Sequence, residues 1–466
     1  MTMNKKIILS FTCLLALTAC GGPSETSLES SSTIETVNVT FNNYDGVKLY
    51  EAEINKGEDA VYVGEEPSKP STEKFVYTFK GWDKPLTKIL LDTVFTAQYE
   101  ESLKQFTIKW VDEDGTILET DDKVTYGTIP TYDGELPSKI EDGLNYKFSG
   151  WDKEIEEATK DMIYTAQYKL DITKGKEFTF GMYPQSHETL KSTVVELNKL
   201  AATLPTKDNA NDWISYKYYA LKKNNVDYMW YKDVTYNDNM YRGVYFDAYR
   251  PMFTTSSSSE SNSLQDNNGY LINTVHWFKF EPITWVCLDD EGLVMAKDIL
   301  DSQVMFPSAD KYKLENDDTL YNCNDYTMSY MRTWLNSNFL DSSFTKSQQG
   351  KIKVSVVNNG LDSTLDESNE FVTSNCLDKV FLLSTKEMLN AEYGFNNSES
   401  RMAKPTDYAA CMGAFIKDTN NNTYYWTRTP DSKMSYRAYQ VDPFGQLRTW
   451  NVYGQAHAGV RPSIHL

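Results

Sequence analysis

The chain of 466 residues is 40% hydrophobic and 14% aromatic, which is enough for about three domains with packed cores. Its formal net charge of −20 and its pI near 4.7 exclude a basic face for nucleic acid and electrostatic docking on anionic lipid. We therefore expect an acidic protein of the cell exterior that has no nucleic-acid partner.

The N-terminus predicts a signal peptide over residues 1–19, followed by a lipid anchor. Two lysines, at 5–6, precede an apolar stretch at 7–17 that is too short to span a membrane with those flanks. It leads into Leu-Thr-Ala-Cys at 17–20, which resembles a bacterial lipobox. The resemblance implies that Cys20 becomes acylated, whereas an ordinary signal peptide ending beside a cysteine is the alternative. Acyl chains would hold the protein in the lipid bilayer, on the extracellular face of the bacterial membrane.

The segment after the signal peptide, residues 20–35, is rich in serine and threonine and almost free of apolar side chains. Such a composition cannot form a core, so we expect a polar tether between the bilayer and the first domain. A flexible coil of this length would reach roughly 20 Å.

Two β-rich repeats are predicted, at residues 36–101 and 102–170. FKGWDK at 79–84 returns 69 residues later as FSGWDK, and FTAQY at 95–99 returns as YTAQY. In both copies apolar residues alternate along predicted strands, and an Asp-Gly pair follows the first strand as a hairpin-type turn. Recurrence at a fixed spacing indicates one structural module that is used twice.

The repeated phrases resemble the internalin-type B repeat, also called the Listeria–Bacteroides repeat. Over residues 36–170 this resemblance implies a β-grasp-like module that bacterial surface proteins use as a spacer and sometimes for adhesion, without catalytic residues. The same range holds 27 Asp and Glu against 15 Lys and no Arg, which suits a solvated stalk better than a binding face. Trp82 and Trp151 could stack on sugars, but in so small a module we expect them to fill the core.

The remaining residues, 171–466, predict one α+β head domain. A strand is expected at 278–288, and a helix is expected at 330–344, where Met331, Trp334, Leu335 and Phe339 form one apolar stripe. The chain lacks the strand–helix–strand rhythm of a parallel sheet, so helices and antiparallel strands should be mixed irregularly.

Two local signals refine the head. At 378–389 a strand enters a helix, with Ser384-Thr385 placed for an N-cap and Glu387 close to the capping-box position. At 424–466 short strands and turns close the chain. The sequence ends on apolar Ile464 and Leu466 with no polar tail, so we expect the last segment to be a paired strand inside the domain.

The head resembles a bacterial domain of unknown function found in extracellular proteins of Firmicutes. The resemblance covers residues 175–466 and rests, in order, on FGMYPQ, YRGVYF, WFKFEPITW, the R-x-WLN segment, VFLLS, TDYA, WTRTP and GVRP. The WTRTP and GVRP segments also resemble C-type-lectin-like and formylglycine-generating-enzyme-like domains. The resemblance implies an α+β head for which a C-type-lectin-like fold is one form.

The sequence carries no complete catalytic or metal motif, and we expect no metal and no cofactor. HExxH, GxSxG and the P-loop are absent, and the four histidines are not spaced as a zinc pair. Ser343 begins an S-x-x-K match whose companion motifs are missing. The cysteines of the head could form bridges in an exterior protein, and Cys287 also suits a buried free thiol; these cysteines are Cys287, Cys323, Cys376 and Cys411.

The predicted function is a non-catalytic ligand-binding or adhesion head on a membrane-anchored stalk, with a glycan or a protein as partner. Aromatic and Arg residues near the end of the chain are the ligand-binding candidates: Trp426, Arg428, Tyr439, Trp450 and Arg461. For Trp426 and Arg461 the alternative is a structural role in holding the terminal strands. The alternative function is an extracellular enzyme, either a formylglycine-type oxidase or a cell-wall hydrolase, which would need a cysteine pair or a carboxylate dyad in a pocket.

Overall fold

The computed structural model describes residues 34–216, 229–249, 264–302, 304, 306, 323–417, 419–452 and 458–466. The predicted signal peptide, the lipidation site Cys20 and nearly all of the tether lie outside the described residues. The chain divides into two compact units. Of the described residues, one unit contains 34–110, 117–132 and 154–164, and the other contains 111–116, 133–153 and those from 165 onward. In the described part of the chain, no helix is long and apolar enough to cross a membrane.

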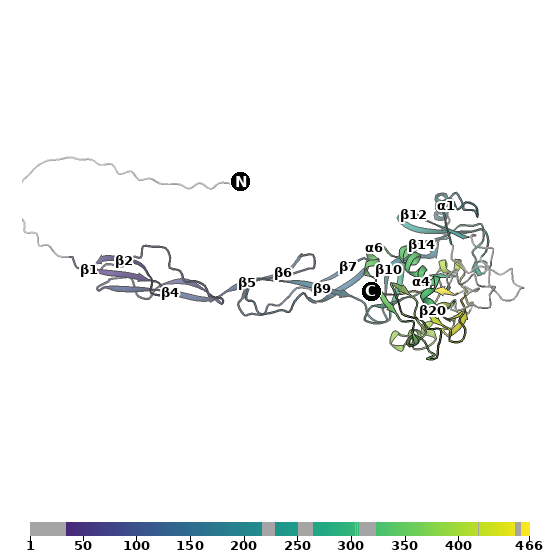
Figure 1. Ribbon diagram of the computed structural model, residues 1–466. Coiled ribbons are helices and arrows are strands. Elements are labelled where there is room, and N and C mark those ends of the chain that lie inside the picture. The colour runs from purple at the N-terminus through teal and green to yellow at the C-terminus, as the bar shows by residue number, and fades with distance from the viewer. Residues whose placement is uncertain are drawn as a thin grey trace, which may run out of the picture. The chain divides into compact units, whose positions relative to one another are not determined.

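The first repeat folds into a four-stranded sheet (Figure 1). Its strand order is β2-β1-β4-β3, with β1 parallel to β4 and the outer pairs antiparallel. The strands are β1 (Thr36–Asn42), β2 (Lys48–Asn55), β3 (Phe75–Trp82) and β4 (Thr93–Leu103). As the alternating pattern predicted, the apolar residues of β1 are buried on one face: Val37, Val39 and Phe41.

Aromatic rings fill the core of the first repeat. The Phe41 ring stacks on Phe95 with centroids 4.8 Å apart, and the Trp82 ring meets Phe41 edge-on at 4.7 Å. The half-buried Trp82 therefore packs into the core, as predicted for a module with few large residues to bury.

The second repeat forms a sheet of order β6-β5-β9-β8-β7. Its strands are β5 (Gln105–Val111), β6 (Ile117–Thr125), β7 (Ser138–Glu141), β8 (Leu144–Trp151) and β9 (Met162–Leu170). Strands β7 and β8 make a hairpin closed by Asp142 and Gly143, whose φ angles of 53° and 85° fit a two-residue turn. The corresponding residues of the first repeat, 69–72, form no strand. The two modules therefore differ at this hairpin.

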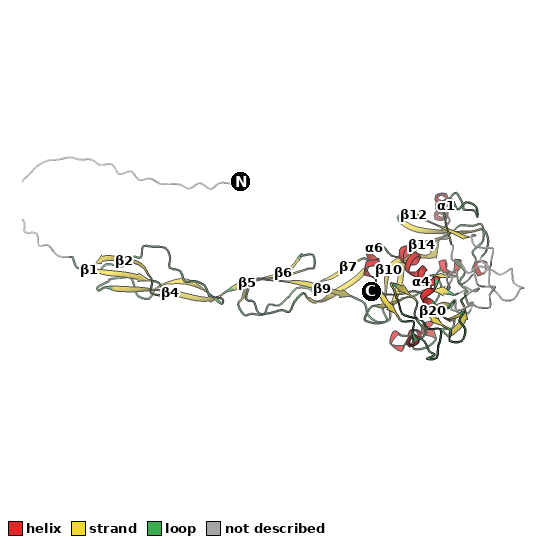
Figure 2. Cartoon of the chain, viewed as in Figure 1, coloured by secondary structure: helices red, strands yellow, loops and turns green. Residues whose placement is uncertain are grey.

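The head contains two larger sheets and one strand pair (Figure 2). The first sheet has the order β11-β12-β13-β14-β15-β24-β19, with β10 also paired to β14. Its strands are β10 (Glu177–His187), β11 (Ile214–Ser215), β12 (Met229–Tyr236), β13 (Asn239–Phe246), β14 (His276–Cys287), β15 (Leu293–Ala296), β19 (Val380–Phe381) and β24 (Ser463–His465).

The second sheet of the head has the order β16-β23-β20-β21-β22. Its strands are β16 (Asp301–Ser302), β20 (Tyr425–Pro430), β21 (Arg437–Val441), β22 (Leu447–Asn451) and β23 (Gly459–Val460). The separate antiparallel pair is β17 (Ser355–Val357) with β18 (Cys376–Asp378). The described chain is thus multi-domain and β-rich, which agrees with the predicted class in its coarse form.

The helices of the head are short. Those described are α1 (Lys191–Leu200), α2 (Leu264–Asn267), α4 (Tyr330–Trp334), α5 (Leu340–Ser343), α6 (Lys346–Lys351) and α7 (Asp407–Cys411). A π-helical turn, η2 (Leu335–Phe339), joins α4 to α5, so the helix predicted at 330–344 is present with one wider turn. Its apolar stripe is buried as predicted: Met331, Trp334, Leu335 and Phe339.

The chain ends inside the first sheet of the head. Strand β24 lies between β15 and β19, and its Ile464 is fully buried. The backbone N–H of Leu466 donates to the carbonyl of Gly292 at 3.0 Å. These contacts confirm the prediction of a paired terminal strand.

Candidate functional site

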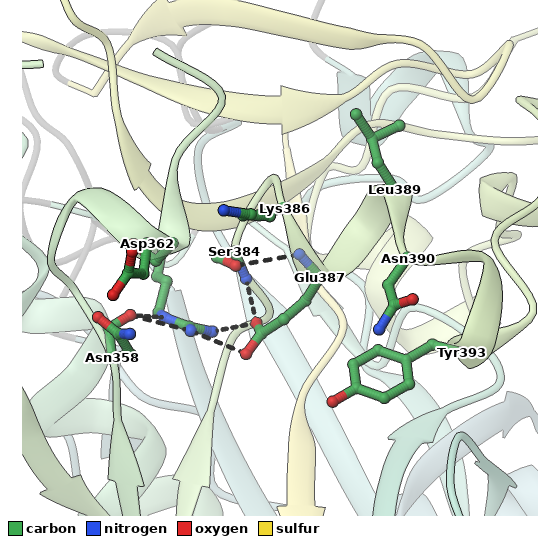
Figure 3. A pocket seen from close by; sticks show the side chains of 10 residues that line it. Asn358, Asp362, Ser384, Lys386, Glu387, Leu389, Asn390 and Tyr393 are labelled. Carbon is green, nitrogen blue, oxygen red and sulfur yellow. Dashed lines mark hydrogen bonds and ion pairs between the residues drawn. The ribbon is translucent and has the colours of Figure 1, made fainter. Parts of the chain in front are cut away.

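A polar cleft of about 460 Å³ opens in the head, where β20, the end of β17, the 3₁₀ turn η3 (Leu361–Ser363) and two further 3₁₀ turns come together. The two further turns are η4 (Glu387–Leu389) and η5 (Ala391–Tyr393). In Figure 3, Asn358 and Asp362 lie on one side of Glu387, and Asn390 and Tyr393 lie on the other. The residues that line the cleft are Asn358, Asp362, Ser363, Ser384, Lys386, Glu387, Leu389, Asn390, Tyr393 and Arg428.

Arg428 forms the base of the cleft, and its guanidinium is only 2% exposed. Its Nη1 donates to Glu387 Oε2 at 2.5 Å and to the Leu382 carbonyl at 2.7 Å. Its Nη2 donates to Glu387 Oε1 at 3.0 Å and to the Asn358 carbonyl at 3.0 Å, and its Nε donates to the same carbonyl at 3.2 Å. All five donors of the guanidinium are therefore used within the protein.

Glu387 is held from two sides. The Ser384 backbone N–H donates to Glu387 Oε2 at 2.7 Å, and the Glu387 N–H donates to Ser384 Oγ at 3.2 Å. The sequence predicted such a reciprocal pair, but it closes the turn before the 3₁₀ turn η4, whose own N-cap is Lys386 without a side-chain hydrogen bond. Burial acts to raise the pKa of Glu387, but the charge and hydrogen bonds of Arg428, with Ser384, lower it overall. The carboxylate is therefore ionised at neutral pH.

The walls of the cleft are mostly neutral. Asn390 uses its side-chain oxygen to cap η5, and Asn358 uses its own to accept from Gly360, which leaves both amide nitrogens without a partner in the described part of the protein. Burial, with the nearby charge of Glu387, raises the pKa of Tyr393, so its phenol stays neutral. Asp362 and Lys386 lie at the exposed edges. The cleft thus offers amides, one phenol ring and two peripheral charges.

Two of the five predicted ligand residues are buried structural groups. Arg461 donates from Nε to the Ala296 carbonyl at 2.8 Å and from Nη1 to the Tyr425 hydroxyl at 3.2 Å. The buried Trp426 packs against Phe306 with ring centroids 5.4 Å apart. This burial supports the structural alternative for both residues, because neither side chain can meet a ligand without displacing its neighbours.

The other candidates are divided between the cleft and the second sheet. Arg428 is a cleft residue, but its donors are saturated. Tyr439 is half-buried on β21 and pairs with Thr449, and Trp450 is 42% exposed on β22 and pairs with Ala438. Neither Tyr439 nor Trp450 lines the cleft. Apart from Arg428, Ser384 and Glu387, the cleft residues were not identified from the sequence, because Asn, Asp and Tyr in loops carry no periodic signal.

The cysteines of the described head form no reactive pair. No disulfide joins any two of Cys287, Cys323, Cys376 and Cys411, so the bridges left open by the sequence are not formed among them. Burial raises the pKa of Cys287 and of Cys376 to about 11.

His276 is buried in β14 with Nε2 3.0 Å from the Leu271 carbonyl, as expected for a packed strand residue. Ser343 of the S-x-x-K match is buried as well. Among the described residues no group of three or more His, Cys, Asp and Glu could hold a metal ion. His457 lies outside the described residues.

Comparison with known proteins identifies one family over the C-terminal part. Residues 289–466 match the model of a family described as Domain of unknown function (DUF6273). No curated protein matches the chain. Among solved structures, Streptococcal High Identity Repeats in Tandem (SHIRT) domains 3–4 from a cell surface protein align at 16% identity, over 29% of this chain and 98% of that chain. Their TM-score of 0.17 does not establish a shared fold. The family match lies within the head and contains every residue of the cleft.

Proposed function

We propose that the protein is a surface lipoprotein, anchored through Cys20, whose repeats form a stalk for a non-catalytic ligand-binding head. The lipobox-like sequence supports the anchor, and the internalin-type B phrases support the stalk. The acidic composition supports a place at the cell exterior. The family matched by residues 289–466 assigns no activity, so the cleft supplies the argument for what the head does.

The observation that carries the proposal is a guanidinium whose donors are all used, lying beneath walls that are neutral apart from Asp362 and Lys386 at their edges. Arg428 forms an ion pair with Glu387 and has no N–H donor left for a ligand. The side chains of Asn358, Asn390 and Tyr393 line the cleft above this pair. Amides and a phenol recognise neutral polar groups, and an aromatic ring gives a face on which a sugar ring can pack. The ligand that fits this cleft is a neutral glycan.

The chemistry of the head favours binding over catalysis. A general acid needs a raised pKa near neutral pH, whereas the pKa of Glu387 is lowered by Arg428 against the effect of burial. A formylglycine-type oxidase needs reactive thiols, whereas the thiols of Cys287 and Cys376 are protonated at neutral pH because their pKa is about 11. The protonation states of Glu387, Cys287 and Cys376 therefore favour a binding site over a catalytic one.

A screen of the detergent-solubilised full-length protein on glycan and extracellular-protein arrays tests the proposal. The wild type should bind a set of neutral glycans, and Tyr393→Ala should lose those signals. The control is Leu271→Ala, which truncates an exposed side chain of the head outside the cleft lining and should leave binding unchanged. Glycan signals that survive in Tyr393→Ala, or binding to proteins alone, would contradict the proposal.

A further inference from the structure

Strand β7 of the β7–β8 hairpin has no counterpart strand in the first repeat. With the offset of 69 residues, β7 corresponds to Lys-Pro-Ser-Thr at 69–72, which forms no strand. Pro70 stands where β7 has Lys139, and proline cannot give the backbone N–H that a paired strand requires. The chain reverses at this point in both repeats, since the Thr72 N–H donates to the Phe75 carbonyl at 2.9 Å in the first, but only in the second is the turn preceded by a paired strand.

The tip of this hairpin contacts α6 of the head. Asp142 Oδ2 accepts from Ser347 Oγ at 2.6 Å, and the Asp142 carbonyl accepts from Gln348 Nε2 at 3.1 Å. Next to them, Lys351 Nζ lies 2.7 Å from Glu141 Oε1. Three side chains of this six-residue helix are therefore engaged by two consecutive residues of the repeat, which fixes the register between the two elements.

An apolar anchor lies beside these polar contacts. Leu144, the first residue of β8, is 2% exposed and belongs to the same hydrophobic cluster as the core of the head. The ion pair of Lys351 with Glu141 is partly exposed, at 29% and 42%, and such pairs contribute little. Burial of a leucine side chain contributes more, so Leu144 provides the main attraction and the polar contacts provide the orientation.

The contacted helix leads directly to the cleft. After α6 ends at Lys351, the chain passes through buried Ile352 and β17 to Asn358, seven residues further on. The carbonyl of Asn358 is the one that receives two hydrogen bonds from Arg428. The surface covered by the hairpin and one wall of the cleft therefore belong to a single short stretch of chain.

We propose that the β7–β8 hairpin is a docking element, and that its interaction surface on α6 holds residues 346–358 and so the Asn358 wall of the cleft. The partner of this surface is the second repeat itself. The first repeat has no strand at the position of β7. The structural unit that supports the cleft accordingly includes residues 133–153, which precede the sequence-predicted start of the head at residue 171.

Hydrogen exchange measured by mass spectrometry on the full-length protein tests the inference. In a chimaera, residues 138–143 (SKIEDG) are replaced by residues 69–74 (KPSTEK) of the first repeat, which keeps the length and removes the strand-forming sequence of β7 with the Glu141 and Asp142 side chains that contact α6. Amides of 346–358 should exchange about tenfold faster, while those of β12 and β13 should not change. Unchanged exchange at 346–358 would overturn the proposal.

Two single variants keep the test decisive if the chimaera does not fold. Leu144→Ala removes the apolar anchor and should also accelerate exchange at 346–358 by about tenfold. The matched control is Leu136→Ala, which makes the same change at a side chain of the second repeat that is 68% exposed, and it should have no effect there. Equal exchange in these two variants would show that the hairpin does not support the cleft.

Discussion

At the scale of single residues, the buried guanidinium of Arg428 depends on Glu387 for its carboxylate partner. Removing one partner of such a pair leaves a buried charge without compensation, so Glu387→Gln should lower the free energy of unfolding by about 3 kcal/mol. Denaturant titration followed by circular dichroism measures this. The control, Asp362→Asn at the exposed edge of the same cleft, should stay within about 0.5 kcal/mol of the wild type.

The same pair gives the head a pH dependence. Because the pKa of Glu387 is lower in the folded protein than in the unfolded chain, its stabilising effect is complete above the unfolded pKa. That effect is lost as the pH falls through the folded value. The stability difference between the wild type and Glu387→Gln should therefore shrink in acid, and a difference independent of pH would show that the pair is not ionised.

The variant Gln440→Met tests whether the buried amide of Gln440 is hydrogen-bonded to water or to a ligand. It is fully buried on β21, and neither its Oε1 nor its Nε2 has a hydrogen-bond partner within the described structure. Leaving such atoms unpaired costs about 1–3 kcal/mol each, so Gln440→Met should raise the free energy of unfolding by about 1 kcal/mol or more. A loss of stability in the same denaturant titration would mean that the amide is bonded to water or to a ligand.

Whether a contact of the site could be predicted depends on how far apart its two residues lie in the sequence. The Ser384–Glu387 cap was predicted because its partners are three residues apart and follow a known local pattern. The Arg428–Glu387 pair spans 41 positions and carries no local signal. Trp426 and Arg461 were named for their residue types, but the burial of an aromatic or Arg side chain is decided by which strands meet in the fold, and the sequence pattern does not contain that information.

At the scale of elements, strand β24 contributes to the stability of the head because it is paired on both sides. Ile464 of β24 is fully buried between β15 and β19, so Ile464→Ala should lower the free energy of unfolding by about 3 kcal/mol through lost burial and a residual cavity. Thermal melting of the purified protein measures the loss. Ile214→Ala, at an exposed position of the edge strand β11, is the matched control and should have the same melting temperature as the wild type.

Elements with a strong hydrophobic periodicity could be predicted from the sequence. A strand as short as β7 could not. The alternation in β1 and the apolar stripe at 330–344 were sufficient to place a strand and a helix correctly. The four-residue strand β7 was not predicted, because the similarity of the two repeats suggested identical modules. Its Asp-Gly turn at 142–143 is a recognisable hairpin signal, but the pairing depends on a local difference from the first repeat.

At the scale of the whole molecule, the proposed anchor depends on one residue. Acyl chains on Cys20 would be the main source of membrane affinity, because the net charge of −20 gives no electrostatic attraction to anionic lipid. We expect Cys20→Ala to release the protein from the membrane fraction of the producing cells. Fractionation with a high-salt wash measures this, and a variant that stays with the membranes would contradict the anchor.

The central claim is that the head binds its ligand in the cleft and not on the terminal sheet. Isothermal titration of the strongest glycan from the array into full-length protein, in detergent, tests it most directly. Tyr393→Ala should raise Kd at least about tenfold, which corresponds to about 1.4 kcal/mol, and Trp450→Ala should leave Kd unchanged. A raised Kd in Trp450→Ala with an unchanged Kd in Tyr393→Ala would place the ligand on the β22 face and contradict the account.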